Sequence, residues 1–477
     1  MTHSLPRFAI LMALIFAQTG YAAARDAVST TPTEQQAISL SIYNNNLALI
    51  KDTRRVKLPR DASALAWRGV SAQMRPETAQ LRNLNTANGL LVQEQYFDFD
   101  LLSPEKLLEA YLGKEVWVIR THPATGVETR EIATVLSTNG GVVLKFDDRI
   151  ETGVPGRLAF AGVPDTLRDT PTLVLSLSNI QAGDHQLELS YLSGGLSWQA
   201  DYVAELNARE DRLDLNGWAT LTNQSGAAYP NTKLQLIAGD VNVASPPMAP
   251  QRSDMAMAKM AEAAQMRSEP AFDNHVYTLP RPVTLAKNQT RQIALMSVSN
   301  VRVIKEYVLR GDSHYYSGPY PDMGQKIKAG VFVELKNAGE GLGIPLPRGV
   351  IRVYQKDAQG NAQFVGEDRI DHTPKNDTIR LKLGDAFDIT ANKKQTDFQK
   401  LPSSGRNTTI ETAYQIVLNN AKKEAVTVNV REPIPGDWIM VSESLPHQKI
   451  ASQLVEWKVK VPAGSSTTLN YRVRVRY

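Results

Sequence analysis

The stretch Gly194-Gly195-Leu196-Ser197-Trp198 constrains the fold more than any other part of this sequence. Alternating apolar residues precede it over 187–191 and follow it over 202–206, which is the pattern of two β-strands. Two glycines and a serine before a tryptophan, between strands, predict a tight crossing where one backbone passes close to a large aromatic ring. We therefore expect a chain built from β-strands that cross at this point.

Period-two alternation recurs along the chain, for example at 173–177, 379–383 and 426–430, and turn-forming residues separate the alternating segments. The pattern predicts a mainly β, multi-domain protein made of β-sandwiches. Two segments, 181–191 and 462–475, each combine a small-residue turn with an alternating strand that carries a tyrosine. This echo is typical of the last hairpin of an immunoglobulin-like sandwich.

Composition shifts divide the chain into regions. Ser103-Pro104-Glu105 predicts the start of a short helix, because Ser caps the first turn, Pro suits it and Glu favours its positive end. Three short strands follow that helix, with spacing that suits a small SH3-like barrel. The predicted regions are a signal peptide at 1–24, an N-terminal β domain at 37–100, the short helix with the small barrel at 101–165, a β-sandwich at 166–310 interrupted by a Met/Ala-rich linker at 244–275, a β region at 311–400, and a C-terminal immunoglobulin-like sandwich at 401–477.

The first residues predict a secretory signal peptide. Arg7 gives a positive start, 8–17 is an apolar core, and Ala22-Ala23-Ala24 offers small residues for cleavage after Ala24 or a residue or two earlier. The apolar core is too short to cross a bilayer, which needs about 20 residues. An uncleaved membrane anchor is the alternative. No later segment approaches transmembrane length, so we expect an exported, soluble chain.

Cysteine content and charge exclude several classes of protein. The sequence contains no cysteine, which excludes a lipobox, thiolate zinc sites and cysteine nucleophiles. An exported chain of this kind must be held together by burial and strand pairing alone. The formal net charge is +4 and the cations are dispersed, so no nucleic-acid partner is expected.

An aromatic, turn-rich loop at 312–322 is the main candidate binding site. The predicted ligand-binding residues are Asp312, His314, Tyr315, Tyr316 and Tyr320. Aromatic rings on a loop stack on sugar rings, and Asp312 and Asp322 are available to bind hydroxyl groups. The alternative is a packed loop whose aromatic residues cover the edge of a sheet.

The linker carries the candidate metal ligands. Five of the eleven methionines lie between Met248 and Met266, and Met255, Met257 and Met260 have a spacing that suits thioether coordination of Cu(I). The alternative is an amphipathic helix or a flexible linker, because methionine is an adaptable apolar filler. The histidines are far apart and lack paired metal-binding spacing, and no cofactor is expected.

No catalytic residue can be assigned from the sequence. There is no G-x-S-x-G elbow, phosphate loop or dinucleotide fingerprint. Asp98 and Asp100 would share a strand face, as an acid–base couple requires. The alternating Phe97 and Phe99 favour a simpler interpretation, in which an amphipathic strand keeps its acids in water.

Several stretches form an ordered set of motifs. They are Leu40–Leu49, Tyr191–Trp198, Gly217–Asn223, Leu234–Asp240, Leu346–Tyr354, Phe364–Gly366 and the surroundings of Trp457 and Tyr471. Taken in this order, they resemble the domain-of-unknown-function family 4139 of exported bacterial proteins. The similarity covers most of residues 40–477 and is strongest after Leu173. It implies an envelope protein of β-sandwich domains without an assigned activity or catalytic residues to transfer.

The expected function is that of an exported bacterial cell-envelope protein, in the periplasm or at the cell surface, that works as a binding or structural interaction module. Its expected partner is an envelope protein or a glycan. The alternative is a hydrolase that acts on an envelope polysaccharide or peptidoglycan, with acids such as Asp98 and Asp100 in its cleft. Cu(I) binding through the Met-rich linker is the third possibility.

Overall fold

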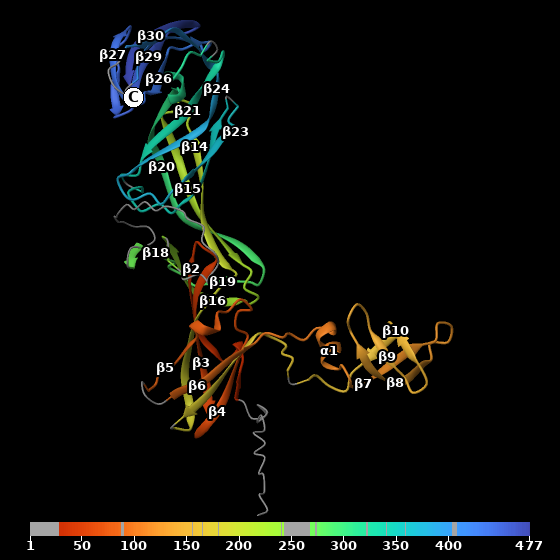
Figure 1. The fold of residues 1–477 in the computed structure, drawn as a ribbon. Helices are drawn as coiled ribbons and strands as arrows, with labels where there is room; N and C mark the ends of the chain where they lie inside the picture. The colour runs from red at the N-terminus through yellow and green to blue at the C-terminus, as the bar shows by residue number, and fades with distance from the viewer. Residues whose placement is uncertain are drawn as a thin grey trace, which may run out of the picture. The chain divides into compact units, whose positions relative to one another are not determined.

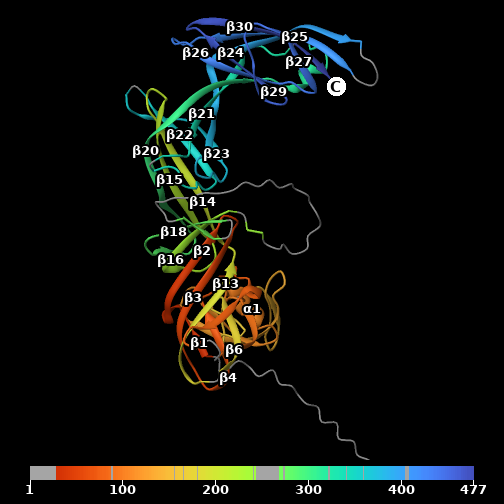
Figure 2. The ribbon, with the colours of Figure 1, turned by 90° about the vertical axis from the view of Figure 1, so that its left-hand side faces the viewer.

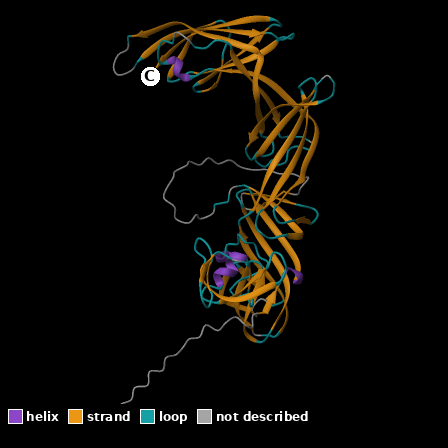
Figure 3. Cartoon of the chain, turned by 90° about the vertical axis from the view of Figure 1, so that its right-hand side faces the viewer, coloured by secondary structure: helices purple, strands orange, loops and turns teal. Residues whose placement is uncertain are grey.

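A computed structural model describes residues 28–86, 90–154, 156–164, 166–179, 181–239, 241–242, 268–271, 274–320, 323–339, 341–357, 359–402 and 408–477. The predicted signal peptide at 1–24 and the candidate copper ligands Met255, Met257 and Met260 lie outside the described residues. Strands dominate the rest, which confirms the mainly β prediction (Figure 3). Among the described residues, no helix is long and apolar enough to cross a membrane.

The chain forms two compact units that do not follow its order (Figure 1). One comprises the chain up to Ala37 together with Lys51–Leu192, and the other comprises Ile38–Ile50 with Ser193–Tyr477. The chain passes from one unit to the other within strands β2 (Gln35–Tyr43) and β3 (Leu47–Leu58). Whether the predicted sequence regions fold independently stays a prediction.

The first unit contains a four-stranded sheet in the order β1-β4-β12-β6. Its strands are β1 (Val28–Thr30), β4 (Asp61–Arg68), β12 (Thr172–Asn179) and β6 (Leu90–Asp98). The other elements near it in the chain are η1 (Pro32–Glu34), η2 (Pro76–Thr78), and β13 (Gly183–Ser193) paired with β5 (Gln80–Asn83). Arg54, with a side chain only 1% exposed, binds Asp52 at 2.7 Å and donates to the Thr30 carbonyl, which ties β1 to β3.

The same unit contains the predicted short helix, α1 (Pro104–Ala110), and a five-stranded sheet. The Ser103 hydroxyl accepts a hydrogen bond from the Lys106 N–H at 3.2 Å, as its capping position predicts. The sheet runs β10-β9-β8-β7-β11 and is open, so the predicted SH3-like barrel is not closed. Its strands are β7 (Glu115–Thr121), β8 (Glu128–Ser137), β9 (Val143–Lys145), β10 (Ile150–Thr152) and β11 (Arg157–Ala159).

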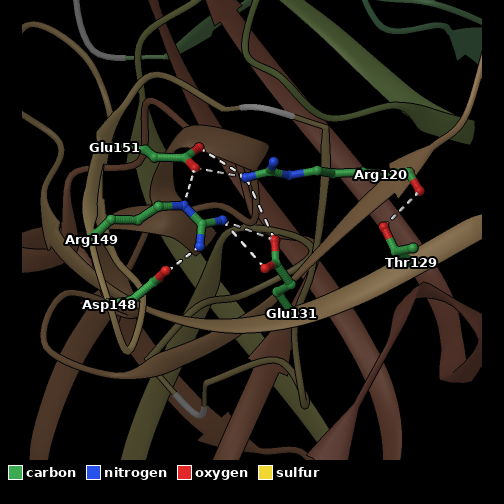
Figure 4. Close-up of polar contacts among 6 residues, drawn as sticks. All are labelled: Arg120, Thr129, Glu131, Asp148, Arg149 and Glu151. Atoms are coloured by element: carbon green, nitrogen blue, oxygen red, sulfur yellow. Dashed lines mark hydrogen bonds and ion pairs between the residues drawn. The ribbon is translucent and has the colours of Figure 1, made fainter.

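A charged network connects the strands of this open sheet (Figure 4). Arg149 binds Glu151 at 2.6 Å and Glu131 at 3.2 Å, and Arg120 binds Glu151 at 2.8 Å. Both guanidinium groups also lie over the Phe146 ring, which belongs to the apolar core beneath. The network therefore covers one part of the small core with paired charges.

The second unit contains a sheet with the order β23-β22-β14-β15-β20-β21-β24-β25-β30-β27, and β26, β28 and β29 branch from that path (Figure 2). β16 pairs with β18 and β19 and, in parallel, with β2, while β17 pairs with β18. The elements of this unit are β14 (Leu196–Leu206), β15 (Arg212–Asn223), β16 (Tyr229–Ala238), β17 (Ser268–Ala271), β18 (Asn274–Thr278), β19 (Val283–Leu285), β20 (Gln289–Arg310), η3 (Ser313–Tyr316), β21 (Ile327–Lys336), β22 (Gly349–Lys356), β23 (Ala362–Ile370), β24 (Thr378–Leu401), β25 (Thr409–Asn420), β26 (Val426–Pro433), β27 (Asp437–Glu443), β28 (Gln448–Ala451), β29 (Leu454–Val461) and β30 (Ser465–Arg476).

The glycine turn before β14 is the tight crossing that the sequence predicts. Gly195 has φ +76°, and a Cβ atom there would lie 2.6 Å from the backbone Cα of Ser225. Its carbonyl accepts a hydrogen bond from the Gln224 N–H at 2.6 Å, so the two backbones touch directly. Trp198 is buried beside this crossing, and its indole donates to the Ile237 carbonyl at 3.1 Å.

Substitution of this glycine tests the crossing. Gly195→Ala should lower the free energy of unfolding by about 3 kcal/mol, because it combines a left-handed φ with a clash against backbone. The matched control is Gly360→Ala, since Gly360 has φ +85° but no atom within 4 Å of a built Cβ. The control should cost only about 1 kcal/mol. Urea unfolding followed by tryptophan fluorescence measures both, and equal losses would contradict the close approach.

Candidate functional site

The candidate binding loop starts where β20 ends. Asp312 caps the short helix η3 and accepts hydrogen bonds from the His314 N–H at 3.1 Å and the ring Nδ1 at 2.7 Å. The His314 backbone N–H is the main cause that holds the pKa of Asp312 below its usual range, and the His314 ring adds to it. The Asp312 carboxylate therefore orders the loop and keeps the exposed His314 ring in place.

Three rings of the loop pack on one another. The His314 and Tyr315 rings have centroids 3.9 Å apart, and Tyr320 meets both in edge-on geometry at 5.4 and 5.3 Å. Gln395 of β24 holds the loop, since it accepts from the Tyr320 N–H at 2.7 Å and donates to the Gly318 carbonyl at 3.1 Å. The loop is thus fixed to the sheet by its backbone, and its rings form a small cluster.

Tyr316 points the other way, into the core of the unit. Its side chain is fully buried, its hydroxyl donates to Glu432 at 3.0 Å, and it shares a hydrogen bond of 2.9 Å with the Tyr471 hydroxyl. Burial is the main cause that raises the pKa of Tyr316 well above its usual value, and the Glu432 charge adds to it. Tyr316 therefore anchors the loop to the core by its buried side chain.

A buried ion pair lies under the loop. Lys393 donates to both oxygens of Glu432 at 2.7 Å, and the two side chains are only 3% and 1% exposed. The Lys393 ammonium lies 5.2 Å from the centroids of both the Tyr315 and Tyr414 rings, which is within cation–π range. A Cβ at Gly311 would lie 2.0 Å from a Glu432 oxygen, so only glycine lets the loop backbone pass this carboxylate.

The loop and the ion pair border a hollow of about 710 Å³. Part of its wall is apolar, from Leu309, Met323, Ile327 and Pro433, and the rest is polar and charged. The polar lining residues are Arg310, Gly311, Asp312, Ser313, His314, Tyr315, Lys393 and Glu432. This volume is within the range of small-molecule and side-chain binding pockets.

Three of the five predicted ligand-binding residues line the hollow, namely Asp312, His314 and Tyr315. Tyr316 is buried beneath it, and Tyr320 packs against the other two rings of the loop. Asp322 lies outside the described residues. Part of the loop therefore packs on the sheet and part of it lines the hollow, and ligand binding by these residues stays a prediction.

The other candidate residues are placed apart from this hollow. Asp98 ends β6 and binds Arg168 at 3.0 Å, and Asp100 lies beyond the strand, 3.6 Å from the Lys106 ammonium. Each carboxylate therefore has its own cation. Within the described ranges, no group of three or more His, Asp or Glu side chains is arranged to hold a metal ion.

Lys393 and Glu432 are not among the residues predicted from the sequence, although the sequence carries a signal for both. Val426, Val428 and Val430 alternate on the buried face of β26, and the next residue of that series is Glu432. Ile389 and Ala391 alternate in the same way in β24, and the next residue is Lys393. A charge that continues a buried period-two series predicts a buried charge, and one of each sign predicts a pair.

Comparison with known proteins gives one match to a family model. The family model of the domain of unknown function DUF4139 matches residues 187–477, which is more than half of the chain and includes the loop and the ion pair. No curated protein matches the sequence significantly. The chain belongs to the DUF4139 family, as its ordered motifs indicate.

Removal of the buried cation tests the network under the loop. Lys393→Met should destabilise the protein by about 3–5 kcal/mol, because it leaves the Glu432 carboxylate buried without its counter-charge. Lys394→Met is the matched control, since Lys394 is the exposed neighbour in the same strand and should change stability by less than 0.5 kcal/mol, about the error of the measurement. Equal effects in urea unfolding would contradict the burial of Lys393. Partial recovery in Lys393→Met/Glu432→Gln would support the pairing.

The buried tyrosines predict a loss of stability at high pH. Tyr316 and Tyr471 keep their protons in the folded protein because burial raises both pKa values, whereas an unfolded chain ionises near pH 10. Their contribution is fully present below about pH 10 and decreases above it, by up to about 1.4 kcal/mol per pH unit for each tyrosine. Tyr316→Phe should make the decrease of unfolding free energy above pH 10 shallower. An unchanged slope would contradict the assignment.

Proposed function

We propose that this DUF4139 protein is an exported bacterial cell-envelope protein, in the periplasm or at the cell surface, that acts as a binding or structural interaction module. The hollow beside the loop at 311–320 carries the proposal. Its lining combines the exposed His314 ring, the half-buried Tyr315 ring, the exposed Arg310 and an apolar wall. Such a mixture of rings, charge and apolar surface is typical of sites that bind an envelope protein or a glycan.

The state of the charged groups supports binding over catalysis. Both oxygens of Glu432 accept from Lys393, and one of them also accepts from Tyr316. Asp312 is occupied as the helix cap and by the His314 ring. A general acid or a nucleophile needs a carboxyl group that is available to the substrate, and these two carboxylates are held by the fold.

A hydrolase that acts on an envelope polysaccharide or peptidoglycan is the second candidate. The observation in its favour is that Asp312 and Glu432 line the same hollow, since paired carboxyl groups perform glycoside hydrolysis. Turnover of a purified envelope polymer that is lost in Asp312→Asn, with the fold retained, would favour it. Cu(I) binding by Met255, Met257 and Met260 is a third proposal that rests on the sequence alone.

We propose immunoglobulin-like packing for the C-terminal region, 401–477, as a finer description of its fold. The support is a shared core in which Trp457 of β29 and Tyr471 of β30 lie 4.7 Å apart between ring centroids, both almost fully buried. β25 pairs with β30 and β26 pairs with β29, which suits two facing sheets. An SH3-like arrangement of β7–β11 remains a proposal of the same kind.

Site-specific crosslinking in living cells tests the binding proposal. A photoreactive amino acid in place of His314 should capture one envelope protein or glycan in near-stoichiometric amount, because this side chain is half exposed at the edge of the hollow. The matched control has the photoreactive residue in place of Phe387, which is 84% exposed in β24 of the same unit. Ser313→Trp, which fills the hollow from an exposed lining position, should reduce the capture at residue 314.

Capture of the same abundant proteins from both positions would contradict a binding role for this hollow. Capture at residue 314 that Ser313→Trp leaves unchanged would show that the partner contacts the loop without entering the hollow. In either case the hydrolase candidate would then be tested by turnover assays on envelope polymers.

A further inference from the structure

A second candidate site lies on the outward face of β14 and β15. A hollow of about 280 Å³ is lined by Asn44, Ser197, Trp198, Gln199, Thr220, Thr222 and Arg348. Ser197 lies directly opposite Thr222, and Gln199 lies directly opposite Thr220, so their polar side chains share one face of the two-stranded ladder. Apart from Arg348, the lining side chains are uncharged.

Asn44 gives this hollow an unusual acceptor. Its amide nitrogen donates to the Trp198 carbonyl at 3.0 Å, which fixes the orientation of the side chain. Its carbonyl oxygen is shielded from solvent and has no hydrogen-bond partner among the described residues. A buried acceptor without a donor costs free energy, and a ligand hydroxyl or amide N–H would satisfy it.

Trp218 lies on the same face of β15 as Thr220 and Thr222, which line the hollow. It lies directly opposite Asp201 and beside the small Ala294 of β20, and 38% of its surface is exposed. Its indole N–H has no partner in the part of the chain that the structure describes. Trp218, Thr220 and Thr222 alternate on one face, so the ring and the far end of the hollow are about 14 Å apart. An indole face in line with hydroxyl and amide groups suits a flat ligand with many hydroxyl groups.

The Asp201 carboxylate on this face is already paired with a cation. Asp201 is mostly buried, and it accepts from Arg352 at 3.0 Å and from the Thr220 hydroxyl at 2.6 Å. Gln292 in turn donates to the Thr220 oxygen at 3.1 Å. A polyanion needs a surface with several cations in excess, and Arg348 is the single charged side chain among the residues that line this hollow.

The pairing of the strands disfavours a peptide ligand. β15 is paired on both sides, with β14 and β20, and β14 is paired with β22 from Ala200 onward. Over Leu196–Gln199, which precedes the pairing with β22, the Trp198 carbonyl accepts from the Asn44 amide. Peptides that add to a sheet need a free edge for several main-chain hydrogen bonds, and this short segment with an occupied carbonyl offers little of one. Side-chain hydroxyls, amides and an aromatic ring are the groups that recognise an uncharged sugar.

We propose that the outward face of β14 and β15, from Trp218 to Asn44, binds an uncharged oligosaccharide. Trp218 stacks on the apolar face of one sugar ring. Thr222, Ser197 and Gln199 exchange hydrogen bonds with its hydroxyl groups, and Asn44 accepts from one of them. Thr220, whose proton is donated to Asp201, can only accept. This site is separate from the hollow at 311–320, and the proposal does not depend on the function proposed for that hollow.

Tryptophan fluorescence of the full mature protein tests this site with three probes, tri-N-acetylchitotriose, cellotetraose and maltotetraose. We expect saturable binding of at least one probe, and an affinity about fivefold lower in Trp218→Ala, because ring stacking contributes about 1 kcal/mol beyond burial. Isothermal titration calorimetry measures the variants, since Trp218→Ala removes the fluorescent reporter. Phe387→Ala, which removes an exposed ring elsewhere in the unit, should bind as the unaltered protein does.

Two further variants separate recognition from folding. Trp218→Phe keeps a stacking ring and should lose less affinity than Trp218→Ala. Thr222→Val keeps the shape of a β-branched residue and should weaken binding through the loss of one hydroxyl. The proposal is overturned if none of the three probes binds, if binding is independent of Trp218, or if only an anionic glycan such as trigalacturonic acid binds.

Discussion

The buried ion pair between Lys393 and Glu432 is the interaction on which the candidate site depends. Each charge is almost fully removed from water, so each needs the other, and the hydroxyl of Tyr316 adds a further donor to the carboxylate. Because Tyr316 belongs to the loop, the same network that neutralises the carboxylate also fixes the loop backbone. Gly311 is required at its position, since any side chain there would displace the Glu432 carboxylate. The buried ion pair and the Tyr316 hydrogen bond thus hold the backbone that carries the His314 and Tyr315 rings.

A chain without cysteine has to hold such loops by other means. In this protein the loop at 311–320 is fastened by Gln395 of β24, Tyr414 of β25 and Glu432 of β26. The polar side chains on the outward face of β14 and β15 are positioned in a similar way, because β15 pairs with β14 and β20, and β14 pairs with β22 from Ala200 onward. Both candidate sites therefore depend on sheet register, and neither requires a mobile segment to be complete.

The local parts of the fold were predictable from the sequence. Alternation predicted β12 and β26, Ser103 and Pro104 predicted α1, and Gly195 predicted the crossing before β14. The pairing of distant strands was not predictable, because a period of two says which face is buried but not which strand lies alongside. The parallel pairing of β14 with β22 is an example. The loop at 312–320 was identified by its rings. Lys393 and Glu432 lie 39 residues apart on β24 and β26, and a period of two does not say that these two strands pack together.

Amide hydrogen exchange of the peptides that cover 309–320 tests most directly whether buried electrostatics holds the loop. The account predicts slow exchange at Gly311, Ser317 and Tyr320, whose N–H groups donate to Arg431, His314 and Gln395. Glu432→Gln should accelerate exchange in these peptides more than in β30, while the rest of the unit stays folded. Exchange in the unaltered loop as fast as that of the exposed turn at 359–361 would contradict the account.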